Sequence, residues 1–124
     1  MAYAAVVTVT RRGSEILVTV AETEAATGSE ATITIAVEKF RVHRQLCQLD
    51  SGTGTTIDPI LARSSGGTGI DIVLQNDAAA ASVDNSITAG AASYVSGGVL
   101  YHKSVVDAGT DNAVTTEYYL TVGW

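Results

Sequence analysis

The side chains best suited to metal binding or nucleophilic catalysis are a histidine and a cysteine four residues apart. His43 and Cys47 supply an imidazole and the sole thiol of the chain, and His102 is the second of its two histidines. Zinc needs three or four ligands, usually in local pairs that close a tetrahedron, and no second pair follows. A catalytic Cys47 would need a base oriented by a third group. No local spacing supplies one, so we predict no metal site and no catalytic residues.

The acidic residues suggest two other functions, glycoside hydrolysis and calcium binding. Glu22 with Glu24, or Asp50 with Asp58, could act as the carboxylate pair of a glycoside hydrolase, but aromatic residues, which form sugar platforms, make up only 6% of the chain. The segment Asp107–Asn112 (DAGTDN) offers oxygen ligands for calcium without the spacing or the downstream glutamate of a calcium loop. The same residue types are typical of β-turns. We therefore predict no cofactor.

Glycine-rich and basic segments give no sign of a phosphate or nucleic-acid site. Gly66, Gly67 and Gly69 precede an expected strand, whereas a phosphate-binding loop leads into a helix. The net charge is −6 with only 7 Lys and Arg, so no broad basic surface is expected to bind nucleic acid. The chain has no run of about 18 apolar residues and no signal-peptide pattern at its start. We expect neither nucleic acid nor a membrane as partner, and synthesis in the cytoplasm.

Composition and hydrophobic alternation predict strands. The 124 residues suit a single domain spanning 1–124, and the abundant Val, Ile and Thr favour a pleated sheet. Tyr3–Thr10 and Glu15–Glu22 predict a β-hairpin around a four-residue loop, Arg11–Ser14.

A change in apolar phase follows the third expected strand. The segment Ala31–Val37 alternates with its apolar residues at odd positions, whereas Phe40, Val42 and Leu46 occupy even ones. Either a β-bulge near Glu38 and Lys39 or a bend between two separate strands would explain the change.

Later segments complete an all-β pattern. Extended structure is expected over Ile57–Ala62, Ile70–Leu74, Val99–Val106 and Thr115–Trp124, and weakly over Ser86–Val95. Asp77–Asp84, with four consecutive alanines, is either one or two helical turns or a loop. About seven or eight short strands predict an antiparallel β-sandwich or jelly roll, or a small barrel, with at most one short helix.

Exposed aromatic and basic residues are the candidates for partner binding. Tyr119 points away from the apolar row of the last strand, which indicates either a sandwich covered on both faces or a subunit interface. The other candidates lie in an N-terminal arm, at the tip of the first hairpin and on the third expected strand. They are Tyr3, Arg11, Arg12, Arg41 and Arg44. Ordinary solvated strand-edge charge is the alternative explanation for the arginines.

Several segments give the chain a resemblance to a known class. The start MAYAAVVTVT, the Thr- and Ala-rich strands, the stretch Ser96–Gly109 (SGGVLYHKSVVDAG) and the ending TVGW resemble small virion structural proteins of tailed bacteriophages, in particular head decoration or cement proteins. The resemblance implies a β-rich subunit without enzyme activity or cofactor. It also implies a dimer or trimer on the outer surface of the capsid, bound to the major capsid protein or other virion proteins and made in the host cytoplasm.

Two alternatives remain open from the sequence. The chain could be a neck or tail component of a virion, such as an adaptor, tube or spike. It could also be a carbohydrate-binding or cell-surface-binding module that uses exposed tyrosines and Asp-rich loops.

Overall fold

The computed structural model describes residues 3–25, 29–63, 71–73, 81–87, 94–107 and 109–123, of which 71–73 are described by their backbone alone. Within these ranges it contains ten β-strands and no helix, so no described helix is available to cross a membrane. The strands are β1 (Ala4–Arg12), β2 (Glu15–Thr23), β3 (Ala31–Thr34), β4 (Lys39–Ser51), β5 (Ile57–Ala62), β6 (Asp71–Val73), β7 (Ser82–Ser86), β8 (Tyr94–Ser96), β9 (Val99–Val106) and β10 (Ala113–Val122).

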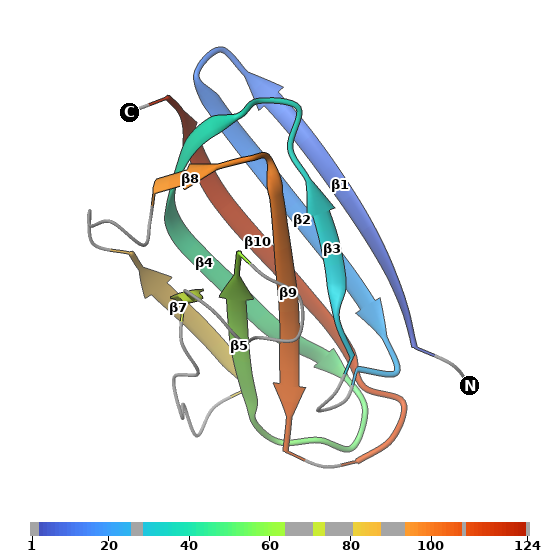
Figure 1. Cartoon of the computed structure of the whole chain (residues 1–124). Helices are drawn as coiled ribbons and strands as arrows, with labels where there is room; N and C mark the ends of the chain where they lie inside the picture. The colour runs from blue at the N-terminus through green and yellow to red at the C-terminus, as the bar shows by residue number, and fades with distance from the viewer. Residues whose placement is uncertain are drawn as a thin grey trace.

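The strands form two antiparallel sheets that face each other (Figure 1). The six-stranded sheet has the order β1-β2-β10-β4-β7, with β8 also paired to β4, and the four-stranded sheet has the order β3-β9-β5-β6. The described strands do not close into a barrel. The predicted all-β fold and its sandwich form are therefore confirmed, and the strands expected at Ile57–Ala62, Ile70–Leu74 and Val99–Val106 are present as β5, β6 and β9.

The first hairpin is tighter than the sequence predicts. Strands β1 and β2 pair without interruption, with Arg11 opposite Ile16 and Arg12 opposite Glu15. The connection is therefore the two residues Gly13 and Ser14, and the four-residue loop is wrong. Gly13 has a φ of 60°, a conformation that glycine adopts without steric cost and that two-residue hairpin turns require.

The phase change after β3 comes from a bend between two strands, and the bulge predicted near Glu38 and Lys39 is wrong. Strand β3 belongs to the four-stranded sheet and β4 to the six-stranded sheet. The bend is held by main-chain hydrogen bonds from Ile35 to the Gly98 carbonyl (2.7 Å) and from Gly97 to the Glu38 carbonyl (2.9 Å). Because the chain crosses to the facing sheet, the inward-pointing positions change from odd to even.

A bulge does occur in β4, at His43. Tyr119 is opposite Arg44 and Leu120 is opposite Val42, so His43 is an extra residue in the ladder. Because of the bulge, the inward-facing positions of β4 change from even numbers, such as Val42, to odd numbers, Gln45 and Cys47. Leu46, which shares the even positions of Phe40 and Val42, is consequently turned to the outer face, where it stands opposite Glu117.

The interior contains two apolar clusters with polar residues between them. Along β9 and β10 the inward side chains run in the order apolar, polar, apolar, from Leu100 to Val106 and from Leu120 to Val114. The alternation predicted for these two strands is confirmed. The larger cluster contains Ile16, Val18, Val20, Ala31, Ile33, Ile35, Phe40, Val42, Leu61, Val95, Leu100, Tyr118 and Leu120, and the smaller one Ala25, Cys47, Ile57, Val83, Val106 and Val114.

Several predicted segments lie wholly or partly outside the described residues. Residues 77–80 of the alanine-rich segment are not described, and Ser82–Asp84 belong to β7, so this end of the segment is a strand and not a helix. Residues 88–93 of the weakly patterned segment, the glycines at 66, 67 and 69, and Trp124 are likewise outside.

Replacing Leu120 by alanine is expected to lower the free energy of unfolding by about 2–5 kcal/mol, because this side chain is fully buried opposite Val42. The same replacement at Leu46, on the outer face, is expected to cost about 1 kcal/mol or less. Equilibrium unfolding in urea measures both. Equal losses for the two leucines would contradict the bulge at His43.

Candidate functional site

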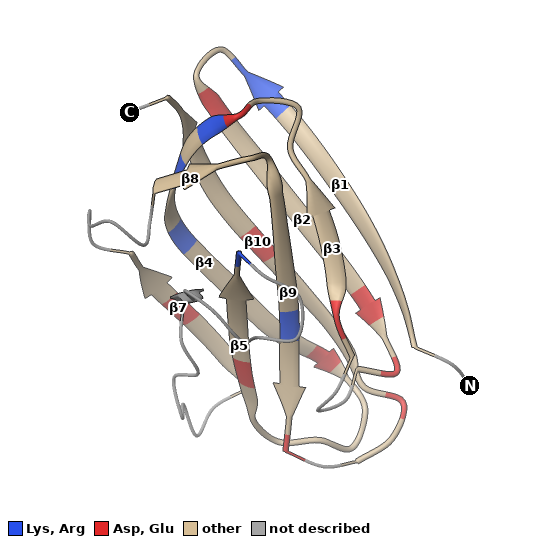
Figure 2. Cartoon of the chain, viewed as in Figure 1, with Lys and Arg blue, Asp and Glu red and all other residues tan. Residues whose placement is uncertain are grey.

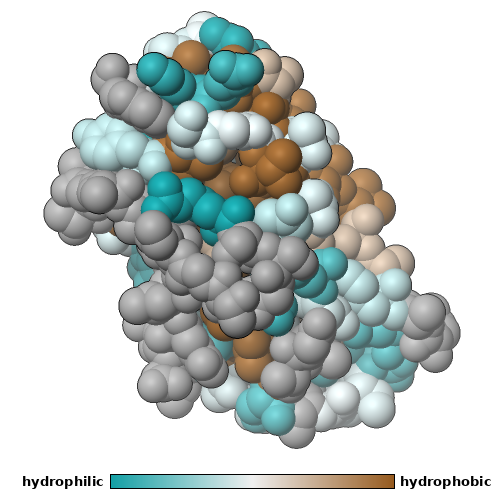
Figure 3. Space-filling model, viewed as in Figure 1, coloured by the Kyte–Doolittle hydropathy of each residue, from teal (hydrophilic) through white to brown (hydrophobic). Residues whose placement is uncertain are grey.

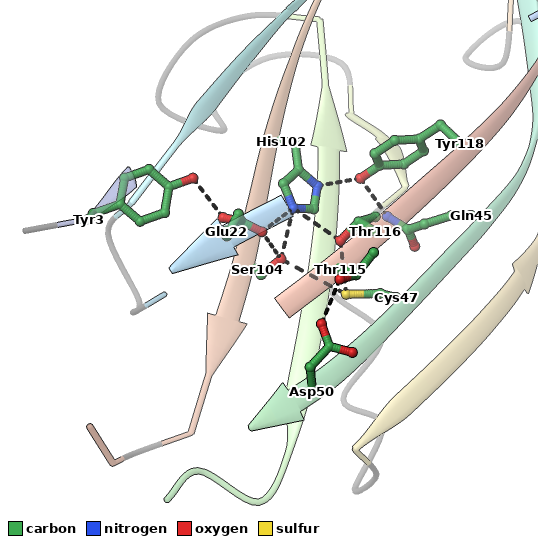
Figure 4. Close-up of polar contacts among 10 residues, drawn as sticks. All are labelled: Tyr3, Glu22, Gln45, Cys47, Asp50, His102, Ser104, Thr115, Thr116 and Tyr118. Atoms are coloured by element: carbon green, nitrogen blue, oxygen red, sulfur yellow. Dashed lines mark hydrogen bonds and ion pairs between the residues drawn. The ribbon is translucent and has the colours of Figure 1, made fainter. Parts of the chain in front are cut away.

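The most connected group of polar side chains is centred on His102, which is fully buried between the sheets (Figure 4). His102 is on β9 in the four-stranded sheet. Its Nε2 atom lies 2.8 Å from Oε1 of Glu22 on β2, and its Nδ1 atom bonds the hydroxyl of Tyr118 on β10. Both partners belong to the six-stranded sheet. The imidazole therefore joins the two layers of the sandwich.

The directions of these hydrogen bonds follow from the donors and acceptors present. Gln45 Nε2 donates to the Tyr118 oxygen at 2.9 Å, and Asn85 Nδ2 donates to Gln45 Oε1 at 2.7 Å. The Tyr118 hydroxyl also bonds Nδ1 of His102, and Nε2 of His102 faces Glu22. Hydrogen bonds therefore run without a break from Asn85 to Glu22.

Glu22 is the common acceptor at the end of this row. Its Oε1 also accepts a hydrogen bond from Ser104 Oγ at 2.6 Å, and its Oε2 accepts one from the Tyr3 hydroxyl at 2.6 Å. Burial alone would raise the pKa of Glu22, but hydrogen bonding and attraction from His102, together with the bonds from Ser104 and Tyr3, lower it below the usual 4.5. Burial and the adjacent carboxylate raise the pKa of Tyr3.

Cys47 lies at the other side of this network. Thr116 Oγ1 is 3.2 Å from Cys47 Sγ and 3.4 Å from His102 Nε2, and Ser104 Oγ is 3.9 Å from the sulfur. Burial raises the pKa of the Cys47 thiol to about 11, against the lowering effect of these hydroxyls. The thiolate, which is the nucleophilic form and the metal-binding form, is thus disfavoured.

The sequence pairs that suggested chemistry are not brought together. His43, the bulge residue, lies near the ring of Tyr119 on the outer face, whereas Cys47 points inward, so the His43–Cys47 pair is separated by the sheet. Glu22 is buried, while Glu24 follows the end of β2. Asp50, on β4 of the six-stranded sheet, accepts a hydrogen bond from Thr115, whereas Asp58 is on β5 of the four-stranded sheet.

The Ser104–His102–Glu22 group differs in geometry from a hydrolase triad. In a triad the serine and the carboxylate bond opposite nitrogens of the imidazole. Here Ser104 Oγ (2.7 Å) and Glu22 Oε1 (2.8 Å) both lie at Nε2, and Tyr118 occupies Nδ1. Ser104 is only 1% exposed. This arrangement satisfies a buried carboxylate and couples two sheets.

The acidic turn after β9 also has a structural use. Asp107 accepts hydrogen bonds from the main-chain N–H groups of Thr55 (2.9 Å) and Thr56 (3.0 Å) and from the Thr55 hydroxyl (2.6 Å). Asn112 Oδ1 accepts one from the Gly54 N–H at 2.9 Å. These bonds join the loop before β5 to the loop before β10. Within the described ranges, no three His, Cys, Asp or Glu side chains are grouped so that they could hold a metal ion.

Two of the predicted partner-binding residues meet on the outer face of the six-stranded sheet. Arg44 and Tyr119 are cross-strand neighbours, and the guanidinium carbon lies 5.4 Å from the centre of the Tyr119 ring. Arg44 also forms two hydrogen bonds with Asp84, at 2.9 and 3.1 Å, which lower the pKa of that carboxyl. The ring of His43 lies 6.4 Å from that of Tyr119. We call these four residues the Tyr119 patch.

A shallow hollow of about 290 Å³ adjoins the Tyr119 patch. It lies along β4, β7 and β10. Its lining residues are Leu46, Cys47, Gln48, Ser82, Val83, Asp84, Thr115 and Glu117.

The other candidates are dispersed. Tyr3 is half-buried and directs its hydroxyl to Glu22. Arg41 donates from Nη2 to the Ile87 carbonyl at 2.9 Å. Arg11 and Arg12 are exposed at the end of β1, and Arg11 Nε donates to the Gly13 carbonyl at 2.9 Å.

The Glu22–His102 contact is the main feature that sequence reasoning missed. The two residues are 80 positions apart, so no local pattern joins them. The available signal was the alternation in Val99–Val106, which puts His102 on the same side as Leu100 and therefore in the core. A buried histidine requires a partner, but the sequence does not say which acidic residue supplies it.

Comparison of the chain with models of protein families, with curated proteins and with solved structures gave no match.

Replacing Glu22 by glutamine is expected to lower the free energy of unfolding at pH 7 by about 1–3 kcal/mol, because it removes the charged acceptor of buried His102 and Ser104 and of half-buried Tyr3. Since the pKa of Glu22 is lowered by folding, its contribution is present above the unfolded value of 4.5 and is lost as the pH falls through the folded value. The deficit of the variant should therefore shrink below pH 4.5.

Urea unfolding of both proteins across this pH range measures the deficit. Glu117→Gln, on the half-exposed outer face of β10, is the matched control and should change stability little. A Glu22→Gln deficit that stays constant in acid would refute the assignment of Glu22 as the buried anion.

The Cys47 thiol is expected to react with a disulfide reagent at pH 8 only when the protein unfolds, because it is buried and its pKa is raised to about 11. In the doubly substituted control Cys47→Ser with Gln48→Cys, the thiol moves to the next, exposed position of β4 and should react at once. Rapid labelling of native Cys47 would contradict the buried placement.

Proposed function

We propose that the chain is a non-enzymatic virion structural protein of the capsid decoration type, which binds and stabilises the lattice of major capsid proteins at the outer capsid surface. The observation that carries the proposal is the outer face of the six-stranded sheet. It bears the Tyr119 patch, and it points away from the four-stranded sheet.

The distribution of side chains supports this role. The side chains most capable of acid–base or nucleophilic chemistry are buried and bonded to neighbours in the core. They are Glu22, His102 and Cys47. On the outer face of the sheet lie Tyr119 and Arg44. Tyrosine and arginine, together with tryptophan, are the residue types most enriched among the interface residues that contribute most of the binding energy. Their ring and guanidinium already contact each other, so less side-chain freedom is lost when a partner binds.

A sandwich of this size can function as a cement without a deep pocket. A subunit that contacts several capsid proteins at once gains avidity, so each contact can be modest. The resemblance of the sequence to phage head decoration proteins supports the same function and adds the identity of the partner.

The proposal is tested by co-sedimentation with expanded capsids that lack the chain. We expect the protein to bind these capsids and to raise the temperature at which they release their DNA. Tyr119→Ala should weaken binding by about 30-fold, as expected for a loss of about 2 kcal/mol. Tyr101→Ala is the matched control, because Tyr101 is a half-exposed tyrosine on β9 of the other sheet.

Absence of binding and of stabilisation would overturn the proposal. Equal effects of the two tyrosine substitutions on binding would show that the Tyr119 patch is not the capsid-binding surface. Binding to one ring at the neck, in place of sites across the shell, would favour the neck or tail alternative.

A further inference from the structure

Strand β1 forms an edge of the six-stranded sheet that differs from the other edges. It is nine residues long and pairs with β2 alone, whereas the described strands at the other edges, β3, β6, β7 and β8, have three to five residues. Natural edges are usually protected by shortness, charge, proline or a bulge. Between Ala4 and Thr10, β1 has none of these.

The same strand carries the exposed apolar side chains. Val6 is 66% exposed and Val9 is 40% exposed, and within the described ranges no other large apolar residue is exposed to this degree. In Figure 3 apolar atoms gather on the side of the molecule where β1 lies in Figure 1. Val6 is on the outer face of the sheet and Val9 on the inner face, as their partners Ala21 and Val18 indicate. The apolar surface therefore follows the strand and does not belong to one face.

We propose that β1 pairs in antiparallel fashion with β1 of a second copy, so that the two six-stranded sheets become continuous across a two-fold axis. The register that pairs all nine residues puts Thr8 opposite Thr8 of the second copy. Val9 then faces Val7 and Val6 faces Thr10, each across the axis. Such a ladder would supply about eight to ten main-chain hydrogen bonds and would satisfy the open edge.

Charge complementarity supports this occupant. The arginines Arg11 and Arg12 lie at the hairpin end of β1, and the acidic residue Glu24 follows Thr23, the partner of Ala4, at the other end of the pair (Figure 2). In the antiparallel register Arg12 of each copy is opposite Ala4 of the other. Glu24 of one copy therefore lies at the same end as Arg11 and Arg12 of the other, and no like charges are opposed.

The two-fold contact is independent of the outer-face interaction proposed above. Pairing uses the edge of β1, whereas the Tyr119 patch lies on β10, β4 and β7 in the same sheet. A dimer would present two such patches and could engage two capsid subunits at once. Because both copies use the same edge, association stops at two chains.

The test uses Thr8, which is exposed and would meet its own copy across the axis. Sedimentation equilibrium of the whole chain is expected to give twice the mass of 12.8 kDa. Thr8→Lys should shift the protein to monomer, because it puts two ammonium groups directly opposite each other. Thr8→Glu should do the same, and an equimolar mixture of the two variants should restore the dimer.

The matched control is Thr19→Lys, which adds the same charge to the neighbouring position on β2. The two copies of this residue would be three strand spacings apart, about 14 Å, beyond the screening length of about 8–10 Å, so the dimer should persist. Circular dichroism checks that each variant keeps its β-structure.

The outcomes separate clearly. A monomeric or trimeric parent chain overturns the proposal, as does a dimer that survives both charge substitutions at Thr8. A mixture that stays monomeric shows that the substitutions act on folding and not on pairing, and this too overturns it. Failure of capsid binding by an intact dimer would affect only the proposed function.

Discussion

A buried carboxylate that needs donors from both sheets is the constraint on which this sandwich depends. Glu22 is 2% exposed and is bonded by His102 and Ser104 from the facing sheet and by Tyr3 from the start of the chain. An unpaired charge at this depth would be costly. The sheets therefore cannot slide past each other by one residue without leaving the carboxylate unsatisfied, whereas valines and leucines alone would tolerate such a shift.

This constraint explains how the core is divided. The network separates the larger apolar cluster from the smaller one along β9 and β10, and hydrophobic burial on each side supplies most of the stabilisation. Buried polar groups add little net stability, but they favour one arrangement over its competitors. The most reactive side chains of the described residues thus fix the arrangement of the interior, and arginine, tyrosine and valine side chains lie on the outer surfaces.

Much of the fold could be predicted from the sequence, because period-two alternation reports directly on which side of a strand faces the core. Strands β2, β9 and β10 follow it without interruption. The sequence predicts too long a hairpin turn, since the residue types around Gly13 do not distinguish a two-residue connection from a four-residue one. The contact between Glu22 and His102 could not be predicted, because it depends on how two sheets align across 80 residues of chain. The pairing of Arg44 with Tyr119 depends on a ladder register that a one-residue insertion alters.

That insertion, His43, determines which side chains of β4 face the core. Before His43 in the sequence, the even-numbered residues Phe40 and Val42 face inward. After it, the odd-numbered residues Gln45 and Cys47 face inward. A regular strand that kept this residue without the bulge would turn the Gln45 amide toward solvent and drive the Arg44 guanidinium into the space between the sheets. Deletion of His43 itself would leave Phe40, Val42, Gln45 and Cys47 on the inner face, so this part of β4 should accept the loss of its bulge residue more readily than the insertion of a further one.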